Sequence, residues 1–343
     1  MNNKIDSLQF VRAFAAIWVL ITHVFQYLDI KPLGNYYLSG QYGVDVFFIL
    51  SGFIIYLTTK DGTLWKHFFT KRVFRVFPAY LFCLVGYWLY FYLIHSERVV
   101  CELWGGVQNL LLFPCSDRIL PSSLIVGQAW STCYEMYFYI VMTTVLLFGA
   151  RKKKILLVLG TLFIFVWLLR GWLRTFGFGR YLFSLLGSIH IYKFCIGILV
   201  AMFYEKLLVL FDRFKMGVVV KWMVFSLLQV IVVAIFFMSY RHYVAPVASI
   251  IMFLSWLLMN QDLIIYSDKF IYKLVKWLGD ISYSIYLVHL LLINIFINQC
   301  HICRWWLLLP IALVATIGVS ACMYRFIEKP GMDLAKQIVK KNR

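Results

Sequence analysis

Two ionisable residues, Arg12 and His23, interrupt the first long apolar run of the sequence, 8–28. Ionisable groups within a membrane span are costly, and they usually face a protein interior or a water-filled cavity, where they mark a functional site. The 11 steps between them, at about 100° each, make about three full turns with a rise of about 16 Å. The spacing therefore predicts one helix face that carries a guanidinium near one membrane surface and an imidazole near the other.

A second cationic pair follows the next apolar run. Arg72, Arg75 and Pro78 form R-x-x-R-x-x-P, which places two guanidinium groups on adjacent turns if the segment is helical. Such a pair can grip phosphates bidentately. The alternative is that these arginines only set the topology and contact lipid headgroups. The spacing leaves both interpretations open.

One segment brings a carboxylate inward from the predicted outer face. The sequence QAWSTCYEMYFY, 128–139, carries Trp130, Ser131 and Glu135, and the carboxylate lies about 10 Å deep if the segment is helical. His23 lies about 8 Å from the outer end of its own run. The similar depths make a pair between His23 and Glu135 geometrically feasible.

Two further segments place polar groups on helix faces that could line the same interior. In GVDVFFILSGF, 43–53, Asp45 lies near the outer surface, as a cavity residue or only an interfacial cap, and Ser51 lies deeper. The ninth apolar run contributes a stripe spaced four and three residues apart, which shares one helical face. Its members are Ser282, Tyr286 and His289.

The elements that position these residues are membrane helices. The chain has 343 residues, 63% hydrophobic and 14% charged, a composition that a water-soluble domain could not bury in one core. Runs of about 17–25 apolar residues are long enough to cross a bilayer. Such runs predict an all-α polytopic bundle of about ten transmembrane helices: 8–28, 43–59, 78–95, 128–149, 155–173, 181–204, 217–239, 244–259, 281–300 and 305–324.

The basic residues are distributed unevenly between the two sides of this bundle. With both termini in the cytoplasm, the inner segments carry 22 Lys and Arg and the outer loops carry 7, which is a positive-inside signature. This explains the net charge of +18 without nucleic acid as a partner. We expect one membrane-embedded domain over 1–330, whose first run is retained because it lacks a small-residue cleavage site, and a basic cytoplasmic tail over 331–343.

The cysteines offer weaker signals. Cys101 and Cys115 share one predicted outer loop, where a disulfide can form if that compartment is oxidising. Cys300, His301 and Cys303 supply three metal ligands with no fourth nearby, so we expect a helix end there and no metal site.

Taken together, the motifs resemble the acyltransferase-3 family, membrane enzymes that acylate carbohydrates and related surface molecules in bacteria. Thr132 departs from the more usual W-S-L-x-x-E, a change that concerns packing because the Trp, Ser and Glu are kept. The matching features, in the family's order, are Arg12 and His23 with ten residues between them, GVDVFFILSGF at 43–53, R-x-x-R-x-x-P at 72–78, WSTCYE at 130–135, SYSIYLVH at 282–289 and FIEKP at 326–330.

The resemblance implies a multi-pass enzyme of the bacterial cytoplasmic (inner) membrane. Such an enzyme transfers an acyl group, most often acetyl, from cytoplasmic acyl-CoA to a hydroxyl of an extracytoplasmic glycan. The partners implied are acyl-CoA, a surface polysaccharide or lipid-linked oligosaccharide, and the lipid bilayer. Acetyl-CoA is then a donor substrate, and no tightly bound cofactor is expected.

The expected mechanism uses His23 as general base on the acceptor hydroxyl, with Glu135 orienting the imidazole. Arg12 is counted with His23 and Glu135 among the expected catalytic residues. Together with Arg72 and Arg75 it is also expected to hold the CoA phosphates. Ser131 is the first candidate for stabilising the oxyanion, and Ser282 and Tyr286 are weaker ones. The remaining residues expected to line the cavity or contact the acceptor are Asp45, Ser51, Trp130 and His289.

Three other hypotheses remain open at this point. The same reaction could pass through a covalent acyl-His23 intermediate. A proton-coupled transporter or flippase of a glycan-related anion could use the same intramembrane Arg, His and Glu to relay protons or bind cargo. An acyl-relay subunit could hand the group to a separate transferase.

Overall fold

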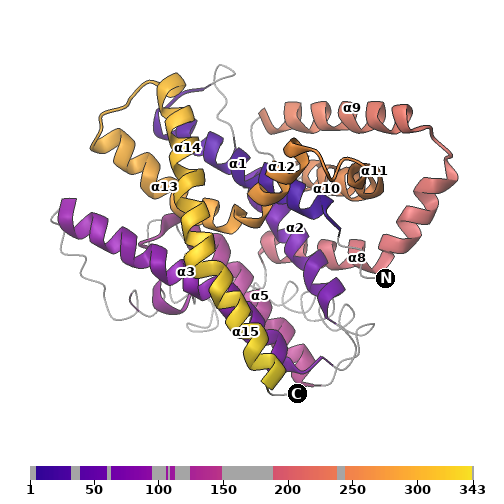
Figure 1. Cartoon of the computed structure of the whole chain (residues 1–343), viewed down its shortest axis with the longest axis horizontal. Helices are drawn as coiled ribbons and strands as arrows, with labels where there is room; N and C mark the ends of the chain where they lie inside the picture. Colours follow the sequence, from indigo (N-terminus) through magenta and orange to yellow (C-terminus); the bar gives the residue numbers. More distant parts are fainter. Residues whose placement is uncertain are drawn as a thin grey trace, which may run out of the picture. The chain divides into compact units, whose positions relative to one another are not determined.

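The computed structural model describes most of the predicted helices. In the described part of the chain all regular structure is helical, and no strand occurs there (Figure 1). The described residues are 5–31, 39–59, 63–94, 106, 109–112, 124–148, 188–237 and 244–341.

Most of the long helices follow the apolar runs, but α3 begins 13 residues before the predicted run 78–95, and α8 extends nine residues beyond the predicted run 181–204. Their bounds are α1 Ser7–Tyr27, α2 Gln41–Thr58, α3 Trp65–Ile94, α5 Trp130–Leu147, α8 Ile189–Arg213, α9 Val218–Phe237, α10 Val244–Leu258, α13 Ser282–Asn298 and α14 Trp305–Met323. Shorter elements are η2 Gly127–Ala129, α11 Asn260–Ile264, α12 Phe270–Asp280, the π-helical turn η3 Tyr324–Glu328 and α15 Lys329–Lys341.

The number of membrane crossings is confirmed only in part. Within the described residues, six helices are long and apolar enough to cross a membrane, or seven if the bent pair α12 and α13 counts as one span. The predicted span 155–173 lies outside the described residues. The total of about ten and the cytoplasmic side of the termini therefore stay predictions.

The chain divides into two compact units. Unit 1 comprises Met1–Phe53 and Leu199–Ala321, and unit 2 comprises Ile54–Ile198 and Cys322–Arg343.

In unit 1, the first turn of α1 is fixed by polar contacts to α11 and α12. The Ser7 amide donates to Asn260 Oδ1 at 2.9 Å, which satisfies one of the amides that a helix start leaves without an intrahelical acceptor. The Asp6 carboxylate, just before the helix, accepts from the Tyr272 hydroxyl at 2.7 Å and pairs with Lys276 Nζ at 2.6 Å. A negative charge at this position also interacts favourably with the positive end of the helix dipole.

A glycine lets α1 and α12 cross at close range. A Cβ added to Gly279 would lie 2.7 Å from the carbonyl carbon and the Cα of Gln9, and closer still to its carbonyl oxygen. Phe10, one residue further along α1, enters an apolar cluster with residues of α9 to α12. The contact with α12 thus fixes both the position and the rotation of the start of α1, the helix that carries Arg12 and His23.

The helix α12 is amphipathic and bends sharply into α13. The two axes differ by 71° across the break. One face of α12 exposes large apolar side chains, and lysines flank that face, as is typical of a helix that lies in the membrane interface. The exposed apolar residues are Phe270, Ile271, Leu274 and Trp277.

In unit 2, α3 lies beside α5 and beside α15 (Figure 1). The helices α3 and α5 run antiparallel. Near the end of α3, the Tyr87 hydroxyl accepts a hydrogen bond from Gln128, just before α5, and near the start of α3 the Phe68 ring contacts the Tyr139 ring further along α5. The start of α8 runs in the same direction as α5, with Phe194 stacked on Phe138 at 4.3 Å between ring centroids.

The segment after the last long helix packs back onto α3. A Cβ added to Gly331 would lie 2.9 Å from Pro78 Cγ and 3.1 Å from the Phe74 carbonyl oxygen, so α15 meets α3 at the proline of R-x-x-R-x-x-P. Just before α15, the turn η3 is π-helical, a form that is frequent at functional sites. Its last residue, Glu328, is fully buried.

Candidate functional site

The imidazole predicted to act as a base lies beside a second imidazole. In unit 1, His23 Nδ1 of α1 is 3.2 Å from His289 Nε2 of α13, with the ring centroids 5.0 Å apart. His23 Nδ1 is also 2.8 Å from the Val19 carbonyl oxygen one turn earlier. His23 is half-buried, whereas His289 is only 1% exposed.

The hydrogen bonds define the tautomers of both rings. A carbonyl oxygen can only accept, so the nitrogen bonded to it must carry the proton. His23 Nδ1 faces the Val19 carbonyl, and His289 Nδ1 faces the Tyr286 carbonyl at 2.8 Å. In the neutral rings both Nδ1 atoms are therefore protonated. His23 Nε2 is left with its lone pair, which is the state that a general base requires.

The serine and tyrosine of the α13 stripe are both buried, and the tyrosine lies next to this pair. The Tyr286 ring lies 5.8 Å from that of His289 and 6.2 Å from that of Phe47 on α2. Ser282 begins α13 at the 71° bend. Its buried hydroxyl has no hydrogen-bond partner among the described residues. The predicted polar face of α13 is thus buried, and its third member, His289, contacts His23.

The other predicted residues of unit 1 lie on α1 and α2. Arg12 is 8% exposed and donates from Nη1 to Gln9 Oε1 at 3.2 Å. Asp45 is fully buried and accepts from Gln41 Nε2 at 3.2 Å, so it is an interior carboxylate. Ser51 is half-buried on α2.

In unit 2, Arg72 lies against aromatic rings. Its guanidinium carbon is 5.3 Å from the centre of the Phe68 ring and 5.4 Å from that of Tyr139, a geometry that favours a cation. Nη2 donates to Thr58 Oγ1 at 3.0 Å. The rings restrict the side chain, which stays partly exposed.

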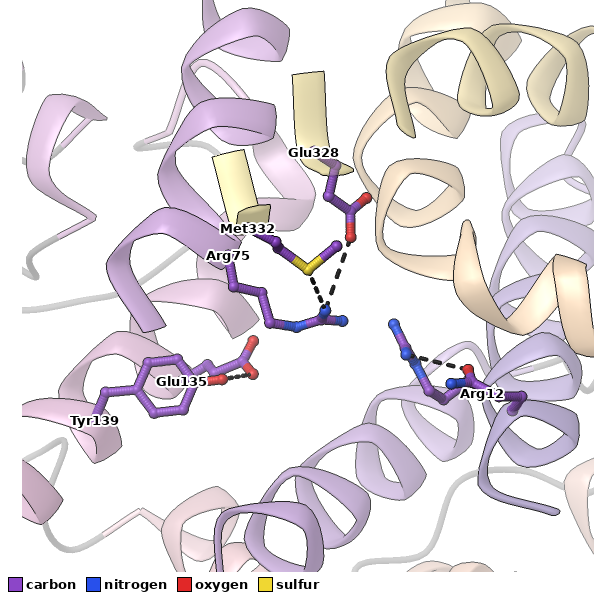
Figure 2. Close-up of polar contacts among 7 residues, drawn as sticks. Arg12, Arg75, Glu135, Tyr139, Glu328 and Met332 are labelled. Carbon is purple, nitrogen blue, oxygen red and sulfur yellow. Dashed lines mark hydrogen bonds and ion pairs between the residues drawn. The ribbon is translucent and has the colours of Figure 1, made fainter. Parts of the chain in front are cut away.

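Arg75, one turn further along α3, faces η3 and α15. Its Nη1 is 4.0 Å from Glu328 Oε1 and 3.2 Å from Met332 Sδ (Figure 2). The Arg75 side chain is 28% exposed and that of Glu328 is fully buried. The closing motif FIEKP therefore contributes the carboxylate that faces the second arginine of R-x-x-R-x-x-P.

Glu135 belongs to the same part of unit 2. Its carboxylate accepts a hydrogen bond from the Tyr139 hydroxyl, one turn along α5 (Figure 2), and the Arg72 guanidinium lies over the Tyr139 ring. Glu135 is thereby linked to an arginine through one tyrosine. His23 is in unit 1 and has the partners described above, so a pair between His23 and Glu135 stays a prediction.

The start of α5 is aromatic and meets the start of α8. The Trp130 and Tyr134 rings lie 5.3 Å and 5.2 Å from the ring of His190. His190 Nδ1 is 3.4 Å from Nζ of Lys193, which is 1% exposed. Ser131 is 8% exposed, and its hydroxyl donates to the Gln128 carbonyl at 3.5 Å.

The structure thus brings some predicted residues together and adds others. It joins His23 to His289, and Arg72 to Glu135 through Tyr139. Sequence reasoning assigned no role to four of the residues found here, although each carried a weak signal: a tyrosine four residues after Glu135, a carboxylate within FIEKP, and a histidine and a lysine within an apolar run. They are Tyr139, Glu328, His190 and Lys193.

Cys300, His301 and Cys303 lie between α13 and α14, with both cysteines exposed. Among the residues described by the structure, no group of three or more His, Cys, Asp or Glu side chains is arranged to hold a metal ion. Cys101 and Cys115 lie outside the described residues.

Comparison with known proteins gives one family and several relatives. The model of the family described as "Acyltransferase domain" matches residues 5–325. Nodulation protein 10 of Rhizobium leguminosarum bv. viciae is 24% identical, over 97% of this chain and 95% of its own length. O-acetyltransferase OatA of Staphylococcus aureus is 30% identical over 45% of this chain and 26% of its own length. Acyltransferase MdmB of Streptomyces mycarofaciens is 29% identical over 40% of this chain and 38% of its own length. No solved structure matches the chain.

Proposed function

Since this chain belongs to the acyltransferase-3 family and is a multi-pass membrane acyltransferase, we propose that it transfers an acetyl group from cytoplasmic acetyl-CoA to a hydroxyl outside the cytoplasm. The proposed acceptor is a surface polysaccharide or a lipid-linked glycan of a bacterial inner-membrane pathway. The names of two relatives, an O-acetyltransferase and an acyltransferase, support this class of reaction.

The observation that carries the proposal is the state of His23. A half-buried imidazole in the first membrane helix has its Nδ1 proton engaged by the Val19 carbonyl, which leaves Nε2 as a base. A general base must be unprotonated and within hydrogen-bond reach of the proton it takes. Acyl transfer to a hydroxyl uses such a lone pair to accept the hydroxyl proton.

In the proposed step, the acceptor hydroxyl oxygen attacks the thioester carbonyl while His23 Nε2 takes the hydroxyl proton. The new C–O bond forms a tetrahedral adduct, which needs donors for its oxyanion. When the adduct collapses, the C–S bond breaks and the proton passes from His23 to the CoA sulfur. The products are the O-acyl ester and free CoA thiol, with no net change at His23.

The proposal assigns the CoA phosphates to Arg72 and Arg75, with Arg12 as a further cation. Arginine suits this role because its planar fork forms paired hydrogen bonds with phosphate oxygens. Arg72 remains partly exposed on its aromatic rings, and 28% of the Arg75 side chain is exposed. Both cations are therefore held in place and still accessible to a ligand.

The test uses purified protein in nanodiscs with radiolabelled acetyl-CoA and membranes that contain the native glycan. The wild-type chain should transfer label to glycan and release an equal amount of CoA thiol. The His23→Ala variant should lose at least about a hundredfold in rate, the lower range for a general base, and should still insert into the membrane. Mass spectrometry of the glycan would identify the acyl group and the hydroxyl.

Other outcomes would reject the proposal. Movement of a glycan across the bilayer with acetyl-CoA unconsumed would identify a transporter or flippase. Consumption of acetyl-CoA only in the presence of a second protein would identify a relay subunit. Full activity of the His23→Ala variant would exclude both direct base catalysis and an acyl-His23 intermediate.

A further inference from the structure

We propose that His289 is a positioning residue that holds the His23 ring in the orientation and tautomer that the reaction uses. The two residues are 266 positions apart in sequence and meet between α1 and α13 through a 3.2 Å contact of His289 Nε2 with His23 Nδ1. The inference rests on the proposed function, in which His23 Nε2 is the base.

The backbone of α13 prepares His289 as an acceptor. Its Nδ1 lies 2.8 Å from the Tyr286 carbonyl and 3.2 Å from the Ile285 carbonyl, so the ring proton is on Nδ1 and is shared by two oxygens. His289 Nε2 consequently has a lone pair, which points at His23. Because the side chain is only 1% exposed, water does not compete for this lone pair.

The lone pair gives the His23 Nδ1 proton a second acceptor. The proton is shared between the Val19 carbonyl at 2.8 Å and His289 Nε2 at 3.2 Å. One acceptor belongs to the same helix and the other to α13, so together they fix the rotation of the imidazole. A ring flip would place carbon atoms against both acceptors and lose both hydrogen bonds.

The same contact strengthens when His23 takes a proton from the acceptor hydroxyl. The ring then becomes an imidazolium, and a hydrogen bond from a charged donor is about twice as strong as a neutral one. His289 therefore stabilises the protonated base more than the neutral base. Loss of the lone pair should lower kcat and should leave the KM for acetyl-CoA nearly unchanged.

Two substitutions of His289 separate this role from simple packing. In His289→Gln, the amide oxygen can occupy the place of Nε2 and accept from His23. In His289→Asn, the shorter amide can keep the Tyr286 contact of Nδ1 but leaves no acceptor near His23. Val288→Ala is the matched control, because Val288 is a buried apolar neighbour on the same helix.

The variants are expected to differ in kcat. His289→Asn should lose about ten- to hundredfold in kcat, the range for a hydrogen bond to a charged group, with KM within about twofold. His289→Gln should recover most of that loss, and Val288→Ala should keep its kcat. Equal kcat for Asn and Gln, or wild-type kcat for Asn, would overturn the inference.

A second readout does not depend on activity. Nitrogen-15 NMR of histidine-labelled protein in nanodiscs should show the Nδ1–H tautomer at His23 in the wild-type chain, and a mixture of tautomers in His289→Asn. An Nε2–H tautomer at wild-type His23 would refute the inference. If His23→Ala is inactive while His289→Asn is fully active, only this inference fails; if His23→Ala is active, the proposed function fails.

Discussion

The crossing of α1 and α12 at Gly279 makes a quantitative prediction about stability. In the Gly279→Ala variant, the new methyl group would lie 2.7 Å from the Cα and carbonyl carbon of Gln9. Ordinary contacts of a Cβ begin at 3.4 Å, so α12 and α1 would have to separate by close to 1 Å or deform. The Asp6 to Lys276 pair at 2.6 Å crosses the same interface and would lengthen with it.

The magnitude follows from two opposing effects. Alanine is favoured over glycine inside a helix by about 0.5–1 kcal/mol. Overpacking a tight contact is unfavourable by about 1–3 kcal/mol. Gly318→Ala in α14 is the matched control, because no atom lies within 4 Å of the added Cβ. The Gly318→Ala control should be stabilised by the helix propensity of alanine alone. The free energies of unfolding of the two variants should therefore differ by about 1–3 kcal/mol.

The assay compares thermal unfolding of both variants with wild type, by fluorescence-detected size-exclusion chromatography in detergent. At about 2 °C per kcal/mol for a large chain, the Tm of Gly279→Ala should lie about 2–6 °C below that of Gly318→Ala. Acyl transfer should also fall in Gly279→Ala, since α1 carries His23. A Tm of Gly279→Ala equal to or above that of the control would show that the two helices do not cross so closely.

Three further predictions concern the polar contacts of the two units. Arg75→Ala should raise the KM for acetyl-CoA by about tenfold or more, since a hydrogen bond to a charged group contributes about 1.5–3 kcal/mol. The KM of Arg75→Lys should lie between those of wild type and Arg75→Ala. An unchanged KM in steady-state kinetics would contradict phosphate binding by Arg75. Tyr139→Phe removes the hydroxyl that donates to Glu135 and should destabilise by about 1 kcal/mol, measured as a lower Tm. Asp6→Asn weakens the partly exposed pair with Lys276 by up to about 1 kcal/mol, and its effect on Tm should shrink at high salt, so a salt-independent loss would point to another cause.

The helices were predictable because hydrophobicity is encoded locally. The apolar run 8–28 corresponds to α1, Ser7–Tyr27, and the run 244–259 to α10, Val244–Leu258. Arg12 and His23 do lie on one helix, as their spacing predicts. Asp45 was left open as a cavity residue or an interfacial cap; it is fully buried, and its role stays a prediction.

The partners of the site residues were not predictable in the same way. His289 was expected to line a cavity, but its contact with His23 joins helices 266 residues apart, and spacing along one helix carries no information about such a contact. Glu328 was visible only as part of a closing motif, since a π-helical turn and the return of α15 onto α3 place it opposite Arg75. The partner that local spacing could have indicated was Tyr139, four residues after Glu135 on the same helix face.

The attachment of α1 to α12 sets how far a donor must reach. With its lysines and its exposed apolar stripe, α12 suits a course along the inner surface on the predicted topology, and Asp6 ties the first turn of α1 to it. From Ser7 to His23 the helix rises about 24 Å, most of a hydrocarbon layer about 30 Å thick. For the proposed transfer at His23, a thioester on a long, narrow carrier can bridge more of that distance than a compact donor such as an acyl phosphate.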